Sequence, residues 1–123
     1  MKIRTHKDLE VFQAAFKAAM EIFDISRGFP KEEIYSLTDQ IRRSSRSVCG
    51  NIAEAFRKRR YPKAFISKLS DCEGEAGETQ TWIDFAHSCG YLSGKVHQDL
   101  FVAYEIIIRK LVTMSLQADK WKW

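Results

Sequence analysis

The segment from Gln40 to Glu54 constrains the fold more than any other part of the sequence. At about 100° per residue, its apolar residues recur along one face of an α-helix. That face comprises Leu37, Ile41, Ser44, Val48, Ile52 and Ala55. Roughly the opposite face carries Arg42, Arg46, Arg57 and Arg60. Such a helix packs its apolar seam against other helices and presents its cations outward, which predicts a helix bundle with a basic surface.

Three further segments show helical periodicity, and no segment has the alternation of a convincing strand. We expect helices over about 7–26, 31–60, 63–89 and 94–118, within a single domain that spans 1–123. Because short connections join long helices, consecutive helices should run antiparallel. The sequence therefore predicts an all-α fold, an antiparallel up-down-up-down four-helix bundle.

Local signals set the expected helix limits and core faces. Pro30 suits the first turn of the second helix, Gly90 is a stop signal for the third, and Ser93 is placed to cap the fourth. The core face expected for the first helix is Leu9, Phe12, Phe16, Ala19 and Phe23. The core face expected for the third helix is Phe65, Leu69, Cys72, Ala76, Thr79, Ile83 and Ala86.

The composition is that of an ordinary soluble domain. Hydrophobic residues make up 45% and charged residues 29% of the 123 positions, a balance that allows a sizeable core. No apolar run approaches the ~18 residues of a membrane span. The start of the chain lacks the apolar segment of a signal peptide. We therefore expect a cytoplasmic protein that does not contact a membrane.

The cysteines and histidines indicate neither a metal site nor a catalytic centre. Cys49, Cys72 and Cys89 lack paired C-x-x-C spacing, and the three histidines do not pair with them at ligand spacing. We interpret the cysteines as structural thiols of a reducing compartment. Because the polar part of the second helix also lacks an activated nucleophile and a histidine base, the sequence predicts a protein without a cofactor that is not an enzyme.

The net charge of +4 is unevenly distributed along the chain. Residues 1–63 contain 14 Lys or Arg against 8 Asp or Glu, a balance of +6. Residues 64–123 contain 6 against 8, a balance of −2. This asymmetry favours either an anionic partner for the first half or complementary contacts between subunits.

A polar stripe follows the boundary between the apolar and basic faces of the second helix. It consists of Gln40, Arg43, Ser47, Asn51 and Glu54. Arg43 and Glu54 offer opposite charges, and Asn51 both donates and accepts hydrogen bonds. We interpret the stripe as a polar network, buried or at an interface, that fixes helix register and oligomer geometry.

The third and fourth helices have more apolar surface than a monomeric bundle requires. Helices that are apolar over more than half their circumference are buried on more than one side, and exposed aromatic area marks association. The expected oligomer interface comprises Trp82, Phe85, Phe101, Tyr104 and Ile108. A stripe of small residues on the third helix would let another backbone approach closely: Ser70, Gly74, Gly77 and Thr81. The sequence thus predicts a homo-oligomer.

Several short motifs occur together in the chain. They are Phe29-Pro30-x-x-Glu33, Leu37-x-x-Gln40-Ile41-Arg42-Arg43, Ser47-Val48-x-x-Asn51-Ile52-Ala53-Glu54 and Gly90-Tyr91-Leu92. Over roughly residues 7–115 the chain resembles the four-helix-bundle proteins encoded in intervening sequences of bacterial 23S ribosomal RNA genes. It departs from them at Ala55, where the family usually has glycine.

The resemblance carries expectations about assembly and partners. It implies a closed four-helix bundle that assembles as a ring, typically a pentamer, with nucleic-acid binding indicated by its charge. A related branch comprises the basic accessory proteins of diversity-generating retroelements, which partner a reverse transcriptase and its RNA.

The candidate functional surface is the set of cations on and after the second helix, with one aromatic residue. Its members are Arg42, Arg43, Arg46, Arg57, Lys58, Arg59, Arg60, Lys63 and Tyr61. Guanidinium groups bind phosphate oxygens bidentately, and one arginine per turn can follow a nucleic-acid backbone without reading its sequence. Tyr61 is suited to stack on an unpaired base. Two other interpretations stay open: a solvated helix face, and pairing with acidic residues of a neighbouring subunit.

We therefore predict a non-enzymatic, oligomeric nucleic-acid-binding protein, with RNA as its partner and a pentamer as the favoured assembly. The alternative is an oligomeric protein–protein interaction scaffold, such as an accessory subunit for a polymerase or reverse transcriptase. In that alternative the exposed aromatic residues, and not the arginines, capture the partner.

Overall fold

The computed structural model of the protein describes residues 2–122, so Met1 and Trp123 of the expected 1–123 domain lie outside the described residues. Its long helices are α1 (Glu10–Ser26), α2 (Leu37–Arg57), α3 (Pro62–Ser88) and α4 (Gly94–Leu116). Its shorter elements are the 3-10 helices η1 (His6–Asp8) and η2 (Lys31–Glu33) and the terminal α5 (Ala118–Trp121). No strand occurs in residues 2–122, which confirms the predicted all-α class.

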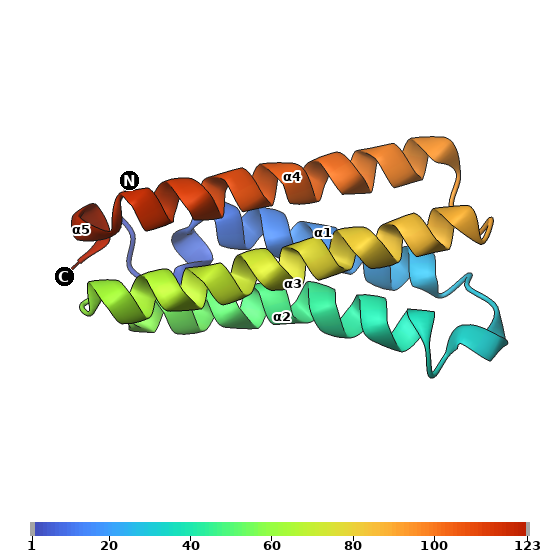
Figure 1. The fold of residues 1–123 in the computed structure, drawn as a ribbon, viewed down its shortest axis with the longest axis horizontal. Helices are drawn as coiled ribbons and strands as arrows, with labels where there is room; N and C mark the ends of the chain where they lie inside the picture. The colour runs from blue at the N-terminus through green and yellow to red at the C-terminus, as the bar shows by residue number, and fades with distance from the viewer. Residues whose placement is uncertain (1, 123) are drawn as a thin grey trace.

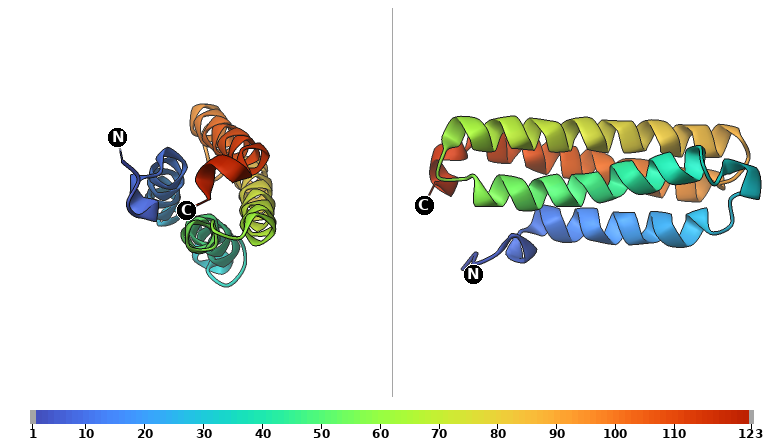
Figure 2. Two further views of the ribbon diagram at one scale, coloured as in Figure 1. Left: turned by 90° about the vertical axis from the view of Figure 1, so that its left-hand side faces the viewer. Right: turned by 90° about the horizontal axis from the view of Figure 1, so that it is seen from below.

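The four long helices lie side by side, and successive helices run in opposite directions along the long axis (Figure 1, Figure 2). Each long helix contacts the next one in chain order, and α1 also contacts α4, which closes the bundle. At the end of the bundle that holds both described chain ends, α5 packs against α3. The arrangement is the predicted four-helix bundle.

The core faces predicted for α2 and α3 are confirmed. Val48 and Ile52 of α2, and Leu69 and Ile83 of α3, are fully buried. A polar pair lies within the same seam, where Thr79 Oγ1 is 2.8 Å from Ser44 Oγ. This pair joins α2 to α3 inside the core and so favours one register between them.

The core face predicted for the first helix is confirmed at Leu9, which is 3% exposed, and is wrong along α1 itself. The residues that this helix buries are Val11, Ala15, Ala18, Ile22 and Ser26. Phe16 is 54% exposed, and Phe12 and Phe23 are only half-buried. Two adjacent stripes of α1 are apolar, and small side chains in the buried stripe let the neighbouring helices approach. The phenylalanines are left along the outer edge, where Phe23 becomes part of the candidate site.

The second helix begins later than predicted. Lys31–Glu33 forms a 3-10 turn, and α2 starts only at Leu37. The reason is the Glu33 carboxylate, which accepts hydrogen bonds from Ser36 Oγ at 2.6 Å and from the Leu37 backbone N–H at 3.3 Å. Its second oxygen accepts from the Tyr91 hydroxyl at 2.8 Å. Led by the bond from Ser36, these bonds lower the pKa of Glu33 and tie the start of α2 to the α3–α4 turn.

The predicted signals around the α3–α4 turn are confirmed. The third helix ends at Ser88, and Gly90 follows with a φ of +82°, a conformation that favours glycine. Ser93 caps α4, because its hydroxyl accepts a hydrogen bond from the Val96 backbone N–H at 3.2 Å.

Candidate nucleic-acid interface

The predicted surface residues separate into two groups and one isolated residue. In the first group, the predicted Arg42 and Arg46 lie together with Phe23 and Arg27, and these four residues are called the arginine–phenylalanine cluster below. The second, called the turn cluster, surrounds the α2–α3 turn and consists of Arg57, Lys58, Arg59, Arg60, Tyr61 and Lys63. Arg43 belongs to neither group.

The arginine–phenylalanine cluster is centred on one aromatic ring. The guanidinium carbons of Arg27, Arg42 and Arg46 lie 4.9, 4.8 and 5.7 Å from the centre of the Phe23 ring. Arg27 directly follows the last residue of α1, four residues after Phe23, and the other two arginines occupy successive turns of α2. A guanidinium within about 6 Å of a ring centre is attracted by the negative face of the aromatic system. Phe23 therefore collects cations from two helices.

A hydrogen-bond relay fixes Arg42 within this cluster. Its Nε donates to Ser26 Oγ at 2.8 Å, and Ser26 Oγ in turn donates to the Phe23 carbonyl at 3.0 Å. Ser26 is only 3% exposed, so the acceptor is shielded from water. Arg42 is thus held by both a ring and a hydroxyl group on α1.

The arginines of this cluster have no acidic partner among the residues that the structure describes. Among residues 2–122, none of Arg27, Arg42 and Arg46 forms an ion pair with a carboxylate. Arg27 and Arg46 are exposed and Arg42 is half-buried. The cluster is therefore a concentrated positive charge that faces solvent.

The turn cluster also packs guanidinium groups on aromatic rings. The guanidinium carbon of Arg59 lies 3.7 Å from the centre of the Phe56 ring, and its Nη1 donates to the Phe56 carbonyl at 2.8 Å. Burial and, to a smaller extent, the charge of Arg57 lower the pKa of Arg59. Arg60 lies 5.8 Å from the ring centre of Tyr61, which is 60% exposed. The other exposed members are Arg57, Lys58 and Lys63.

Arg43 lies on the side of α2 that faces α3. Its Nη1 is 3.9 Å from Asp39 Oδ2, one turn earlier on the same helix. Burial and the nearby Glu78 raise the pKa of Glu75 on α3, and the charge of Arg43 opposes that rise. The structure therefore separates Arg43 from the cations that surround Phe23.

Within residues 2–122 the side chains of the polar stripe do not bond one another into a network. Gln40 and Glu54 are exposed, and Ser47 and Asn51 are half-buried. None of these four side chains bonds another of them in the described residues. Instead, Glu54 pairs with Lys68 of α3 at 2.7 Å, and this bond lowers the pKa of Glu54. The internal polar contact between α2 and α3 is the pair of Ser44 and Thr79, which the sequence analysis did not identify.

The residues predicted for an oligomer interface occupy different environments. Tyr104 is 0% exposed and lies in the core, so its assignment to the interface is wrong. At about 100° per residue its position on α4 lies at the edge of the buried face, beside Leu111, where apolar periodicity does not distinguish the core from a flanking stripe. The half-buried members are Trp82, Phe101 and Ile108. Phe85 is 54% exposed and is the one of these five residues whose side chain lies mostly in solvent.

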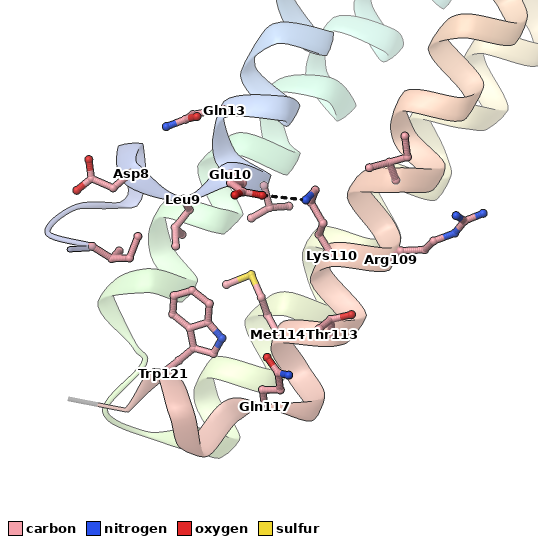
Figure 3. Close-up of a pocket in the computed structure, with 13 residues that line it drawn as sticks. Asp8, Leu9, Glu10, Gln13, Arg109, Lys110, Thr113, Met114, Gln117 and Trp121 are labelled. Atoms are coloured by element: carbon pink, nitrogen blue, oxygen red, sulfur yellow. Dashed lines mark hydrogen bonds and ion pairs between the residues drawn. The ribbon is translucent and has the colours of Figure 1, made fainter. Parts of the chain in front are cut away.

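Two hollows lie away from the predicted cations. The larger, of about 840 Å³, lies between α1 and α4 close to the described chain ends, and Figure 3 shows Met114 and Trp121 on its wall. An ion pair between Glu10 and Lys110, 3.1 Å apart, spans its rim (Figure 3). The smaller, of about 400 Å³, lies at the other end of the bundle. Its lining is Glu33, Tyr35, Ser36, Leu37, Gln40, Trp82, Phe85 and Cys89.

The described residues offer few groups for other chemistry. No three His, Cys, Asp or Glu side chains of residues 2–122 are placed to hold a metal ion together. Burial raises the pKa of Cys49 to about 11 and that of Cys72 to about 12, which disfavours their reactive thiolates. Across the described part of the chain, every helix is too short or too polar to cross a membrane.

Sequence reasoning missed three residues of the arginine–phenylalanine cluster and its support, namely Phe23, Ser26 and Arg27. Phe23 was assigned to the core, and Arg27 was not grouped with the cations of α2. The spacing of Phe23 and Arg27, four residues apart on one helix, is a local signal for a ring–cation pair. The meeting of that pair with Arg42 and Arg46 depends on the register between α1 and α2, which no local pattern gives.

Comparison with known proteins places this geometry among related bundles. The model of one family, described as 23S rRNA-intervening sequence protein, matches residues 7–113. A crystal structure at 1.70 Å of a protein of unknown function from the S23 ribosomal protein family of Bacteroides thetaiotaomicron has a similar fold. Its TM-score is 0.77 at 23% identity, over 85% of this chain and 97% of that chain. No curated protein matches the sequence.

Proposed function

The chain belongs to the family of 23S rRNA-intervening sequence proteins, and from that premise we propose that it is a non-enzymatic protein that binds RNA through its arginine–phenylalanine and turn clusters. The partner is a structured RNA whose phosphate backbone, and not its base sequence, is recognised.

The observation that carries the proposal is the set of exposed cations without acidic partners. Arg46, Arg57, Lys58 and Lys63 are exposed, and none of them forms an ion pair within residues 2–122. By contrast, Lys68, Lys95 and Lys110 are paired with carboxylates. A surface of unpaired cations releases counterions from a polyanion when it binds, and this release supplies most non-specific nucleic-acid affinity.

The chemistry of the two clusters suits RNA. Arginine binds phosphate oxygens through two parallel N–H donors, a geometry that lysine lacks. Tyr61, which is 60% exposed beside Arg60, offers a ring on which an unpaired base can stack. Together these groups provide phosphate contact along α2 and a stacking platform at its end.

The test is a fluorescence anisotropy titration of a labelled structured RNA with two variants of equal net charge. R42A/R46A/R57A/R60A removes four cations from the clusters, and K17A/K95A/R109A/K120A removes four exposed cations from other faces. We expect the first variant to lose more than about tenfold in affinity and the second to lose much less, because local phosphate contacts outweigh total charge. Equal losses in the two variants, with both folded by circular dichroism, would contradict the proposal.

We also propose that the chain assembles into a homo-oligomer, with a pentameric ring favoured by the family resemblance. Exposed apolar side chains support this second proposal, since Tyr35 is 92% and Phe85 is 54% exposed beside the smaller hollow. Several copies of a modest basic site on one ring would engage one RNA with avidity.

Native mass spectrometry tests the assembly directly. The F85S variant should dissociate the oligomer, whereas the quadruple arginine variant should leave it intact. If the aromatic variant instead abolishes capture of a protein partner while RNA binding is absent in every variant, the function is that of a protein–protein scaffold, such as an accessory subunit of a polymerase or reverse transcriptase. A monomeric wild-type protein would refute the assembly.

A further inference from the structure

Three positive charges converge on the Phe23 ring from two helices. Because each guanidinium carbon lies within 5.7 Å of one ring centre, no two of them are more than about 11 Å apart. The Debye length is about 10 Å at 0.1 M salt, so neighbouring charges at this separation still repel one another. Such a cluster is stabilised when an anion binds between its members.

The ring and its helix hold the arginines before any ligand arrives. Phe23 attracts all three guanidinium groups, and Ser26 accepts a hydrogen bond from the Nε of Arg42 at 2.8 Å. Arginine has five N–H donors, and this bond uses one of those on Arg42. The terminal N–H groups are the ones that bind phosphate in parallel pairs. Ordering a long side chain in advance removes a cost that binding would otherwise carry.

The surrounding charges leave this site to an external anion. The ion pair nearest in sequence on α2 is that of Arg43 with Asp39, at 3.9 Å, and Arg43 lies outside the cluster. Within residues 2–122, no carboxylate of the chain pairs with Arg27, Arg42 or Arg46. A neutral or cationic ligand would gain nothing from these groups. A phosphate group, with several oxygens and a full negative charge, matches them.

We propose that the arginine–phenylalanine cluster is a phosphate-binding site in which Arg27, Arg42 and Arg46 contact the backbone of the bound RNA and Phe23 is the positioning residue. The choice of RNA rests on the proposed function, whereas the phosphate site itself rests on the geometry of the cluster. The site adds Arg27, the residue that directly follows α1, to the interface. It also makes affinity depend on an uncharged side chain.

Anisotropy titration with labelled structured RNA tests the positioning role. F23L removes the aromatic ring but keeps every charge. F16L is its control, because Phe16 is exposed on the same helix and, among the described residues, no cation–π contact is seen at its ring. F23L should weaken RNA binding about fivefold, in the range of one or two exposed cation–π contacts. F23W should restore the affinity, since tryptophan is the best ring for a cation. F16L should stay within about twofold of wild type.

Arg27 provides a second and independent test. R27A removes an exposed cation from the end of α1 and K17A removes one from within α1, but only the first touches the cluster. R27A should lower both the affinity and the steepness of its salt dependence, the latter by about 0.7 to 0.9 for one lost phosphate contact. K17A should change neither. If F23L and R27A both bind as wild type while the quadruple arginine variant does not, the inference is overturned and the proposed function is retained.

A probe without bases separates the site from the RNA. Inorganic tripolyphosphate titrated into 15N-labelled protein should shift the Nε–H resonances of Arg27, Arg42 and Arg46 in wild type, and shift them far less in F23L. If tripolyphosphate shifts these resonances but the protein binds no RNA, the phosphate site is supported and the proposed RNA-binding function is refuted. Unchanged resonances in wild type would overturn the site, whatever the protein does with RNA.

Discussion

Replacing Thr79 by valine is expected to destabilise the bundle by removing a buried hydroxyl group. Thr79 Oγ1 lies 2.8 Å from Ser44 Oγ and 2.8 Å from the Glu75 carbonyl on its own helix, and Thr79 and Ser44 are 0% and 1% exposed. Valine has nearly the shape of threonine, so the change opens little space. Between the helices the effect falls on the Ser44 hydroxyl, which loses its close partner and, in the described residues, keeps a long contact of 3.5 Å to the Ile41 carbonyl.

The loss of stability in T79V depends on the Ser44 hydroxyl, which stays buried without its Thr79 partner. A buried polar group that loses its partner costs about 1–3 kcal/mol, whereas replacing both partners by apolar groups of similar shape is nearly neutral. We therefore expect T79V to cost about 1–2 kcal/mol and S44A/T79V to cost clearly less than the sum of the two single changes. The coupling free energy between the two positions should be about 1 kcal/mol.

Urea denaturation of wild type, the two single variants and the double variant measures this coupling. T81V is the control, because Thr81 is exposed on the same helix and its hydroxyl donates to the Gly77 carbonyl of that helix at 3.1 Å. It should change the free energy of unfolding by less than about 0.5 kcal/mol. Equal m-values would show that all variants unfold from comparable states. Strict additivity of S44A and T79V would refute the role assigned to the pair.

Two other stability predictions concern the turns. The folded pKa of Glu33 lies below its ordinary 4.5, chiefly through the bond from Ser36, so its contribution is complete above pH 4.5 and is lost as pH falls through the folded pKa. The difference in Tm between wild type and E33Q should thus be largest near neutral pH and shrink in acid; a constant difference would contradict this origin. G90A should cost about 1–2 kcal/mol because Gly90 has a φ of +82°. G74A should instead stabilise the protein by up to about 1 kcal/mol in thermal denaturation, because Gly74 is helical and the space that an alanine Cβ would occupy is open. A G74A variant less stable than G90A would refute the argument.

Much of the fold was accessible from the sequence because α2 and α3 each have one apolar face. In these helices the period of apolar residues leaves a single choice of core, and the structure follows it. The first helix has two adjacent apolar stripes, and periodicity alone favours the one with larger side chains. The structure buries the stripe with smaller side chains, because Ala15 and Ala18 let neighbouring helices approach closely. The late start of α2 also escaped prediction, since Glu33 bonds to Tyr91, 58 residues further along the chain.

The candidate site was predictable in composition but not in arrangement. Its α2 cations follow from one helical wheel, which places Arg42 and Arg46 on the side away from the core. The ring that gathers them belongs to α1, and only the packing of α1 against α2 brings Phe23 and Arg27 to the same place. For the same reason the sequence grouped Arg43 with residues from which the structure separates it.

The most direct test of the central claim is the affinity of the wild-type protein for a structured RNA across a series of salt concentrations. Phosphate contact through both clusters predicts that log affinity falls linearly with log salt, with a slope steeper than about −2, since each contact contributes about 0.7 to 0.9. The slope should become shallower in the quadruple arginine variant. Absence of binding at low salt, or an affinity that does not respond to salt, would contradict the account.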